Sequence, residues 1–195
     1  MERRSLSVLA LLAVVLALPL SASQFIQMPF DQVAREASLV VRGHVVDTFS
    51  AWDSAHEVIY TYATVRVQRY FGEATGPYTL VVREVGGTVD GYTQEAIGFP
   101  MIRQNEQVVL FLSQWEDSGD YRIHAFNQGK FLVRNRDGVE ILVEDPVKQG
   151  DARMTRDGRF AIEPNSETGL RMDEFAAMVD DARAGVSENH RRTRQ

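Results

Sequence analysis

Few side chains in this sequence are of the types that carry out catalysis. The chain contains four histidines and no cysteine, which excludes a thiol nucleophile, a disulfide framework and a cysteine-ligated zinc site. The only local group that combines acid, hydroxyl and imidazole is formed by Asp53, Ser54, His56 and Glu57. General acid–base catalysis or metal binding requires such groups to converge on one point, and polar loops commonly have this composition without either role.

The sequence signatures of common enzymes are absent. There is no Gly-x-Ser-x-Gly nucleophile elbow and no Gly-x-Gly-x-x-Gly loop, and Tyr60 stands where a zinc hydrolase motif beginning at His56 would need its second histidine. A serine–histidine–aspartate triad assembled from distant segments stays open. We therefore predict no catalytic residue, no metal ligand and no cofactor, and an extracytoplasmic hydrolase with dispersed catalytic residues is the less favoured alternative.

A binding surface is the better functional hypothesis. In residues 57–71, aliphatic side chains alternate with Tyr60, Tyr62 and Arg66. If this segment is a strand with its aliphatic side chains buried, then Tyr60, Tyr62 and Arg66 point outward. A tyrosine ring offers apolar area with a polar tip, which suits stacking on a sugar or a peptide. Trp52 and Trp115, in the flanking loops, would enlarge this surface. The alternative is that the tyrosines are only good strand formers.

The elements that position these residues are mostly strands. Alternation and turn residues predict strands over residues 38–48, 57–71, 78–85, 106–113, 121–126, 129–134 and 139–143. Asp137-Gly138 predicts a hairpin turn between the last two. Residues 86–105 are rich in glycine and show no clear periodicity. Loops of this length are often functional, and we expect this one to border the tyrosine surface.

Two helices are expected, one near each end of the mature chain. Residues 31–37 read as a short helix capped by Asp31. Towards the C-terminus, apolar side chains recur at helical spacing and predict an amphipathic helix that ends at Gly185. This apolar face comprises Met172, Phe175, Met178, Val179 and Ala182. We expect it to pack on the domain's own sheet, with a partner-binding helix as the alternative.

The first 23 residues have the pattern of a secretory signal peptide. A charged start is followed by an apolar run over residues 6–20 and by the small residues Ser21, Ala22 and Ser23. The run is short for a membrane span, although an uncleaved anchor is the alternative. Export without cysteine indicates a bacterial periplasmic or secreted protein.

The remaining segments divide by composition. Residues 24–143 form the expected barrel domain, 144–167 a polar connection with a short hairpin around Asp157-Gly158, 168–185 the C-terminal helix and 186–195 a disordered tail. The 195 residues carry a net charge of −6, which argues against nucleic-acid binding because that usually requires a basic surface.

The strand pattern predicts a mainly β fold. A long first strand with a central glycine, a meander of three strands, a connection and further strands favour a small OB-like β-barrel, with a β-sandwich as the alternative. The expected barrel core comprises Leu39, Val41, Val45, Ile59, Val65, Val67, Val108, Leu110 and Leu112.

Several of these stretches resemble a group of exported bacterial proteins of unknown function. The resemblance covers roughly residues 28–135 and is carried by residues 37–46, 59–67, 86–87, 106–112 and 128–131. It implies an OB-type, netrin/tissue-inhibitor-like barrel and an extracytoplasmic location, and it implies no particular reaction.

We therefore expect a non-catalytic binding module for a protein, peptide or glycan of the cell envelope. The second hypothesis is the hydrolase named above. The third, suggested by the fold analogy alone, is an accessory or inhibitory subunit of an exported protease.

Cell fractionation tests the predicted export. The protein should be recovered outside the cytoplasm, and N-terminal sequencing should place its first residue near Gln24, because the peptidase site follows the small residues at 21–23. A full-length chain in the cytosol would contradict the prediction.

Overall fold

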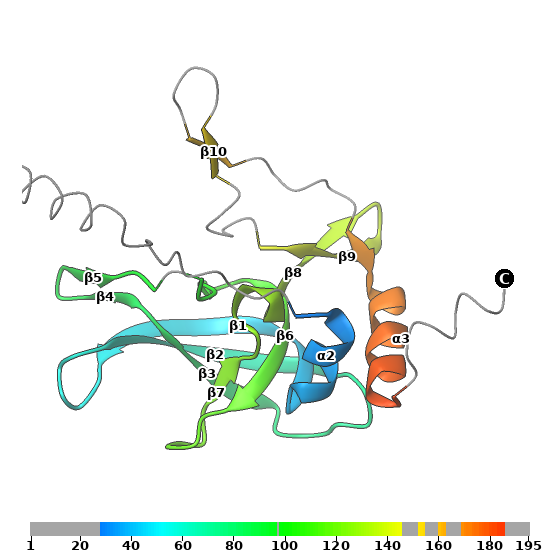
Figure 1. The fold of residues 1–195 in the computed structure, drawn as a ribbon, viewed down its shortest axis with the longest axis horizontal. Coiled ribbons are helices and arrows are strands. Elements are labelled where there is room, and N and C mark those ends of the chain that lie inside the picture. Colours follow the sequence, from blue (N-terminus) through cyan, green and yellow to red (C-terminus); the bar gives the residue numbers. More distant parts are fainter. Residues whose placement is uncertain (1–27, 97, 146–151, 155–159, 163–168, 186–195) are drawn as a thin grey trace, which may run out of the picture.

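A computed structural model describes residues 28–96, 98–145, 152–154, 160–162 and 169–185 (Figure 1). The predicted signal peptide, the predicted tail and most of the predicted polar connection lie outside these residues. Within that connection, β10 (Ala152–Met154) pairs antiparallel with β11 (Phe160–Ile162). No helix in the described part of the chain has the length and apolar character needed to cross a lipid bilayer.

Together with four short elements that the sequence did not predict, the predicted elements are present in the order expected. They are α2 (Phe30–Glu36), β1 (Leu39–Trp52), β2 (Ile59–Tyr70), β3 (Thr79–Val85), β4 (Gly87–Val89), β5 (Tyr92–Gln94), β6 (Gln107–Gln114), β7 (Tyr121–Ile123), the 3₁₀ turn η1 (Phe126–Gly129), β8 (Lys130–Arg136), β9 (Val139–Glu144), β12 (Leu170–Arg171) and α3 (Met172–Arg183).

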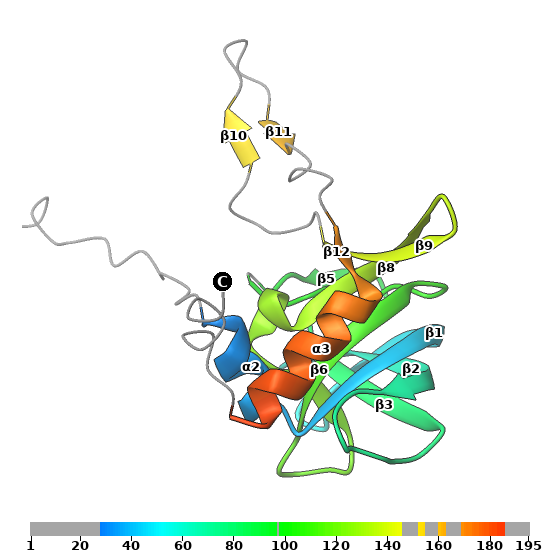
Figure 2. The ribbon, with the colours of Figure 1, turned by 90° about the vertical axis from the view of Figure 1, so that its right-hand side faces the viewer.

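Five strands close into a barrel, which confirms the predicted fold class over the sandwich alternative. Strands β1, β2, β3, β7 and β6 are neighbours in that order, and β6 pairs back onto β1. The β3–β7 contact is parallel, whereas the other pairings are antiparallel. Strands β8, β9 and β12 extend the sheet beyond β6 (Figure 2). The architecture is thus an OB-like barrel with a strand extension and two helices.

Strand β1 closes the barrel because it bends at Gly43. The register shifts between Arg42 and Gly43 and again between Val45 and Asp47, so the strand carries two irregularities of the kind that increase bend and twist. A Cβ atom at position 43 would lie 2.5 Å from Val65 Cγ1 and 2.9 Å from the Arg66 carbonyl oxygen. Glycine is therefore required at this point of the pairing between β1 and β2.

Two hydrophobic cores lie on opposite faces of β1 and β6. Val41, Val45, Val108, Leu110 and Leu112 point into the barrel. The intervening residues of the same strands face a second core, formed with α2, α3 and β8–β9. Helices α2 and α3 lie side by side over this second core (Figures 1 and 2).

The predicted core residues are buried, except that Leu39 is only half-buried, and Ile59 is buried outside the two cores. The predicted apolar face of the C-terminal helix packs on the domain itself. Ala176 also belongs to this buried face, and Met178 is only half-buried.

A buried lysine joins the barrel to its extension. Lys130 is 1% exposed, and its Nζ lies 2.8 Å from Glu106 Oε2 and 2.7 Å from Asp145 Oδ2. It also donates to the carbonyl oxygen of Met101. A buried ammonium needs such partners because its desolvation is costly. The lysine thereby links the start of β8, the end of β9 and the segment before β6.

Three local expectations were wrong. Asp31 does not cap α2: the helix begins one residue earlier, and Asp31 forms an ion pair of 2.8 Å with Arg35 instead. The fifth predicted strand ends at Ile123, because Ala125 and Phe126 have positive φ angles of 57° and 55°. The predicted loop 86–105 contains the β4–β5 hairpin, whose turn is Asp90-Gly91, with φ angles of 50° and 82°.

Truncating the central core residue tests the barrel. Leu110 is fully buried, so Leu110→Ala should lower the free energy of unfolding by about 2–5 kcal/mol through lost burial and a cavity. The exposed Val81 provides the control, because Val81→Ala should change stability by less than about 1 kcal/mol. Equal denaturation midpoints for Leu110→Ala and the wild type would show that the inward face of β6 is misassigned.

Candidate functional site

The outer surface of strands β1–β3 carries a row of aromatic and cationic side chains. Tyr62 of β2 is the direct cross-strand neighbour of Phe49 in β1 and of Arg83 in β3. The rings of Phe49 and Tyr62 stack with centroids 5.0 Å apart and planes 9° apart. Phe49 is 56% exposed, so this stacked pair presents apolar area to solvent.

Arg83 lies between two further rings. Its guanidinium carbon is 5.0 Å from the centroid of Tyr60 and 4.6 Å from that of Trp115, distances at which cation–π attraction is favourable. The Trp115 indole donates to the Arg83 carbonyl oxygen at 3.0 Å, and Arg83 Nη2 pairs with Asp117 Oδ1 at 2.6 Å. Trp115 and Asp117 thus fix the loop between β6 and β7 against β3.

The charge of Arg83 is well stabilised. Partial burial favours the neutral form, but hydrogen bonds to Asp117 and to Tyr62 outweigh it and raise the pKa of Arg83 above its usual value. A second guanidinium, that of Arg122 in β7, lies 5.1 Å from the Trp115 centroid. We call the surface formed by Phe49, Tyr60, Tyr62, Arg83 and Trp115 the aromatic face.

The structure brings together three of the five predicted site residues. Tyr60, Tyr62 and Trp115 meet in the aromatic face. Arg66 is an exposed residue on the same side of β2 but pairs with His44 and Thr79, roughly 13 Å along the strand from Tyr62 at the usual rise per residue. Trp52 lies on the other side of the sheet, where it stacks on His56 and meets Tyr92 edge-on.

The glycine-rich segment 86–105 also lies on that other side. Thr61 points away from Tyr60 and Tyr62 because successive side chains of a strand alternate, and Thr61 Oγ1 donates to the Gly86 carbonyl oxygen at 2.7 Å. A Cβ at Gly87 would lie 2.4 Å from Ser50 Oγ, so the hairpin approaches β1 and β2 closely. The segment therefore covers the barrel mouth and does not border the aromatic face.

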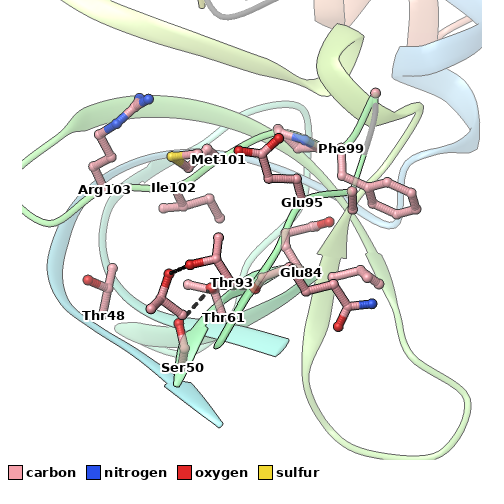
Figure 3. A pocket seen from close by; sticks show the side chains of 18 of the residues that line it. Thr48, Ser50, Thr61, Glu84, Thr93, Glu95, Phe99, Met101, Ile102 and Arg103 are labelled. Carbon is pink, nitrogen blue, oxygen red and sulfur yellow. Dashed lines mark hydrogen bonds between the residues drawn. The ribbon is translucent and has the colours of Figure 1, made fainter. Parts of the chain in front are cut away.

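A pocket of about 550 Å³ lies beneath this segment (Figure 3). Its volume is in the range typical of small-molecule sites. Hydroxyl-bearing side chains of β1 and β2, namely Thr48, Ser50 and Thr61, line one side. Met101 and Ile102, from the segment after β5, line the opposite side.

Glu84 of β3 is the buried carboxyl group of this pocket. It is 4% exposed and accepts a hydrogen bond from the Ile123 backbone N–H. Burial raises the pKa of Glu84 to about 8, despite the opposing effects of that hydrogen bond and of the positive charge of Arg122. Glu84 is therefore mainly protonated at neutral pH and can donate a hydrogen bond.

The other candidates for chemistry have structural roles. Asp53 Oδ1 accepts the N–H groups of Glu57 and Val58 at 2.7 and 3.2 Å, and these bonds lower the pKa of Asp53. The group at residues 53–57 therefore forms a turn. Among the residues that the structure describes, no three acidic or histidine side chains are grouped closely enough to hold a metal ion.

One serine–histidine contact exists outside the pocket. Ser113 Oγ is 2.8 Å from His124 Nδ1, and Glu36 Oε2 is 3.7 Å from His124 Nε2. The second distance exceeds that of a hydrogen bond, burial lowers the pKa of His124, and none of the three residues lines the pocket. The contact is not an assembled triad.

Phe49, Arg83 and Glu84 were missed by the sequence analysis. Phe49 lies beyond the predicted end of the first strand at residue 48, whereas β1 continues to Trp52. Arg83 and Glu84 lie in a correctly predicted strand whose two faces were not assigned. The buried Leu80 and Val82 in that strand would have placed Glu84 inside and Arg83 outside.

Glu84 makes stability depend on pH. Its pKa is about 8 in the folded state against 4.5 for a free side chain, so the folded protein holds a proton that the unfolded chain loses in this range. The free energy of unfolding therefore falls as pH rises from about 4.5 to about 8, by about 1.4 kcal/mol per unit at most. Glu84→Gln, which cannot ionise, should lack this contribution.

Denaturant unfolding across this pH range measures the effect. The stability difference between Glu84→Gln and the wild type should grow in favour of the variant as pH rises. The exposed Glu95, which also lines the pocket, provides the control variant Glu95→Gln. Parallel stability curves for the wild type and Glu84→Gln would refute the raised pKa.

Comparison with known proteins gives no family assignment. No protein-family model matches the chain, and no curated protein matches it significantly.

Proposed function

We propose that this protein is an exported, non-catalytic binding module that holds a protein or extended peptide partner of the cell envelope on its aromatic face. The expected signal peptide supports export to the periplasm or the exterior. The net charge of −6 gives no support to a nucleic-acid partner. A glycan partner is the alternative outcome of the test below.

The observation that carries the proposal is the position of Arg83 between the rings of Tyr60 and Trp115, beside the exposed Phe49. Tyrosine, tryptophan and arginine are the residue types enriched in the energetic centres of protein interfaces. Here they come from three separate segments and are already held together in the unbound chain. Preorganised side chains lose less conformational entropy on binding.

The location of the aromatic face supports the same proposal. OB-folds bind their ligands along the face of the second and third strands, helped by the loops that flank it. In this barrel, Tyr60, Tyr62 and Arg83 lie on the outer side of β2 and β3, and Trp115 and Asp117 come from the loop between β6 and β7. The helices cover the other side of the molecule, at β1 and β6.

Immobilised mature protein, exposed to a periplasmic extract, tests the proposal. The captured partner is purified, and its affinity is then measured by titration calorimetry. The double variant Tyr60→Ser/Tyr62→Ser should weaken binding at least about tenfold, since truncating a tyrosine in the energetic centre of an interface costs about 2 kcal/mol or more. Far-UV circular dichroism should stay unchanged.

Two tyrosines away from the aromatic face give a matched control. Tyr78 and Tyr92 are 70% and 67% exposed, and Tyr78→Ser/Tyr92→Ser should bind as the wild type does. Equal affinity of the folded Tyr60→Ser/Tyr62→Ser variant would exclude the aromatic face. If the wild type binds glycans on an array and the Tyr60→Ser/Tyr62→Ser variant does not, the partner is a glycan and not a protein.

A further inference from the structure

The pocket at the barrel mouth has its own binding chemistry, independent of the aromatic face. Its walls come from β1, β2, β3 and the segment that follows β5. The β4–β5 hairpin supplies Thr88, Thr93 and Gln94 as a further wall. Side chains from these segments point into one space in Figure 3, so a ligand there would be contacted from several directions.

The hydroxyl wall presents hydrogen-bond acceptors in a defined direction. The single proton of the Thr61 hydroxyl is donated to the Gly86 carbonyl oxygen at 2.7 Å. Ser50 Oγ lies 3.0 Å from Thr61 Oγ1, so Ser50 must be the donor in that pair. The Ser50 hydroxyl proton is then used, and its oxygen lone pairs remain as acceptors for a ligand.

Donor groups come from other walls of the pocket. Gln94 Oε1 accepts the backbone N–H of Ile59 at 2.7 Å, which fixes the orientation of the side-chain amide. The structure shows no partner for its Nε2 group among the described residues, which leaves two N–H donors. The protonated carboxyl of Glu84 is a further donor.

The rest of the lining limits the charge and shape of the ligand. Glu84, Glu95 and Arg103 are the only ionisable side chains among the described residues that line the pocket. Glu95 and Arg103 are exposed, and Arg103 already pairs with Glu106 at 3.3 Å. Met101 and Ile102 provide an apolar surface opposite the hydroxyls. The pocket therefore matches a ligand with many hydroxyl groups, one apolar face and no charge.

We propose that the mouth pocket binds a small, uncharged, polyhydroxylated molecule of one or two sugar rings. The ligand hydroxyls donate to Ser50 and accept from Gln94 and Glu84, while the ring's apolar face lies against Met101 and Ile102. This site lies on the opposite side of β2 from Tyr60 and Tyr62, so it does not rest on the function proposed above.

Saturation-transfer NMR and calorimetry with defined sugars test the proposal. The uncharged probes are glucose, N-acetylglucosamine and maltose, and the charged probes are glucuronate and glucose 6-phosphate. At least one uncharged probe should bind saturably, and the charged probe of similar size should bind at least about tenfold more weakly because no free cation lines the described pocket interior. The proposal is overturned if none of the uncharged probes binds saturably, or if a charged probe binds more tightly than the uncharged probe of similar size.

Two variants assign the binding to this pocket. Gln94→Glu keeps the acceptor for the Ile59 N–H but replaces the amide donor by a carboxylate, and Ser50→Ala removes the acceptor lone pairs. Each should weaken binding of the uncharged probe about tenfold or more, with thermal unfolding confirming that the variant is folded. Thr64→Val, on the outer side of the same sheet, is the matched control and should bind normally.

Tyr60→Ser/Tyr62→Ser should also bind the sugar normally. If the double variant loses sugar binding while Gln94→Glu and Ser50→Ala retain it, the sugar binds at the aromatic face and the pocket assignment is overturned.

Discussion

The bend of β1 at Gly43 is the constraint on which the architecture depends. One strand must pair with β2 along most of its length and with β6 at its beginning, and it does so only by turning sharply where the two pairings overlap. The backbone of β2 approaches so closely there that a side chain has no space. Barrel closure removes the free edges that an open sheet of these five strands would have, and all binding surfaces considered above follow from that closure.

Closure also explains why different surfaces of the barrel have different chemistry. Strand β6 and the first part of β1 are buried on both faces, since the barrel core lies on one side and the helical core on the other. Among the described residues, no second core covers the outer side of β2 and β3, and side chains such as Arg66 and Val81 are exposed there. The hairpin segment lies over the barrel mouth, and a partly open pocket lined by inward side chains lies beneath it. The same sheet thus carries the aromatic face on one side of β2 and the mouth pocket on the other.

The sequence predicted those features that depend on local periodicity. Alternation placed Tyr60 and Tyr62 outside and Val65 and Val67 inside, and Asp137-Gly138 identified a hairpin correctly. Contacts between distant segments were not predictable in this way: Arg83 meets Asp117 and Trp115 only because the β6–β7 loop folds over β3. Trp52 was expected in a flanking loop, whereas β1 continues through it and its side chain contacts His56 and Tyr92. The β4–β5 hairpin had a signal in Asp90-Gly91, the same dipeptide as at 137–138, which was overlooked.

The buried ammonium of Lys130 has a consequence for how the walls of the mouth pocket are held. It anchors the Met101 carbonyl, Glu106 and Asp145 at once, and separating a buried charge from its partners costs about 3–5 kcal/mol. The β4–β5 ribbon has only three residues in each strand and packs against β1 and β2. The two walls are therefore held differently: buried ion pairs fix the 101–106 side, whereas the ribbon is tied to β2 by the hydrogen bonds from Thr61 to the Gly86 carbonyl oxygen and from the Ile59 N–H to Gln94.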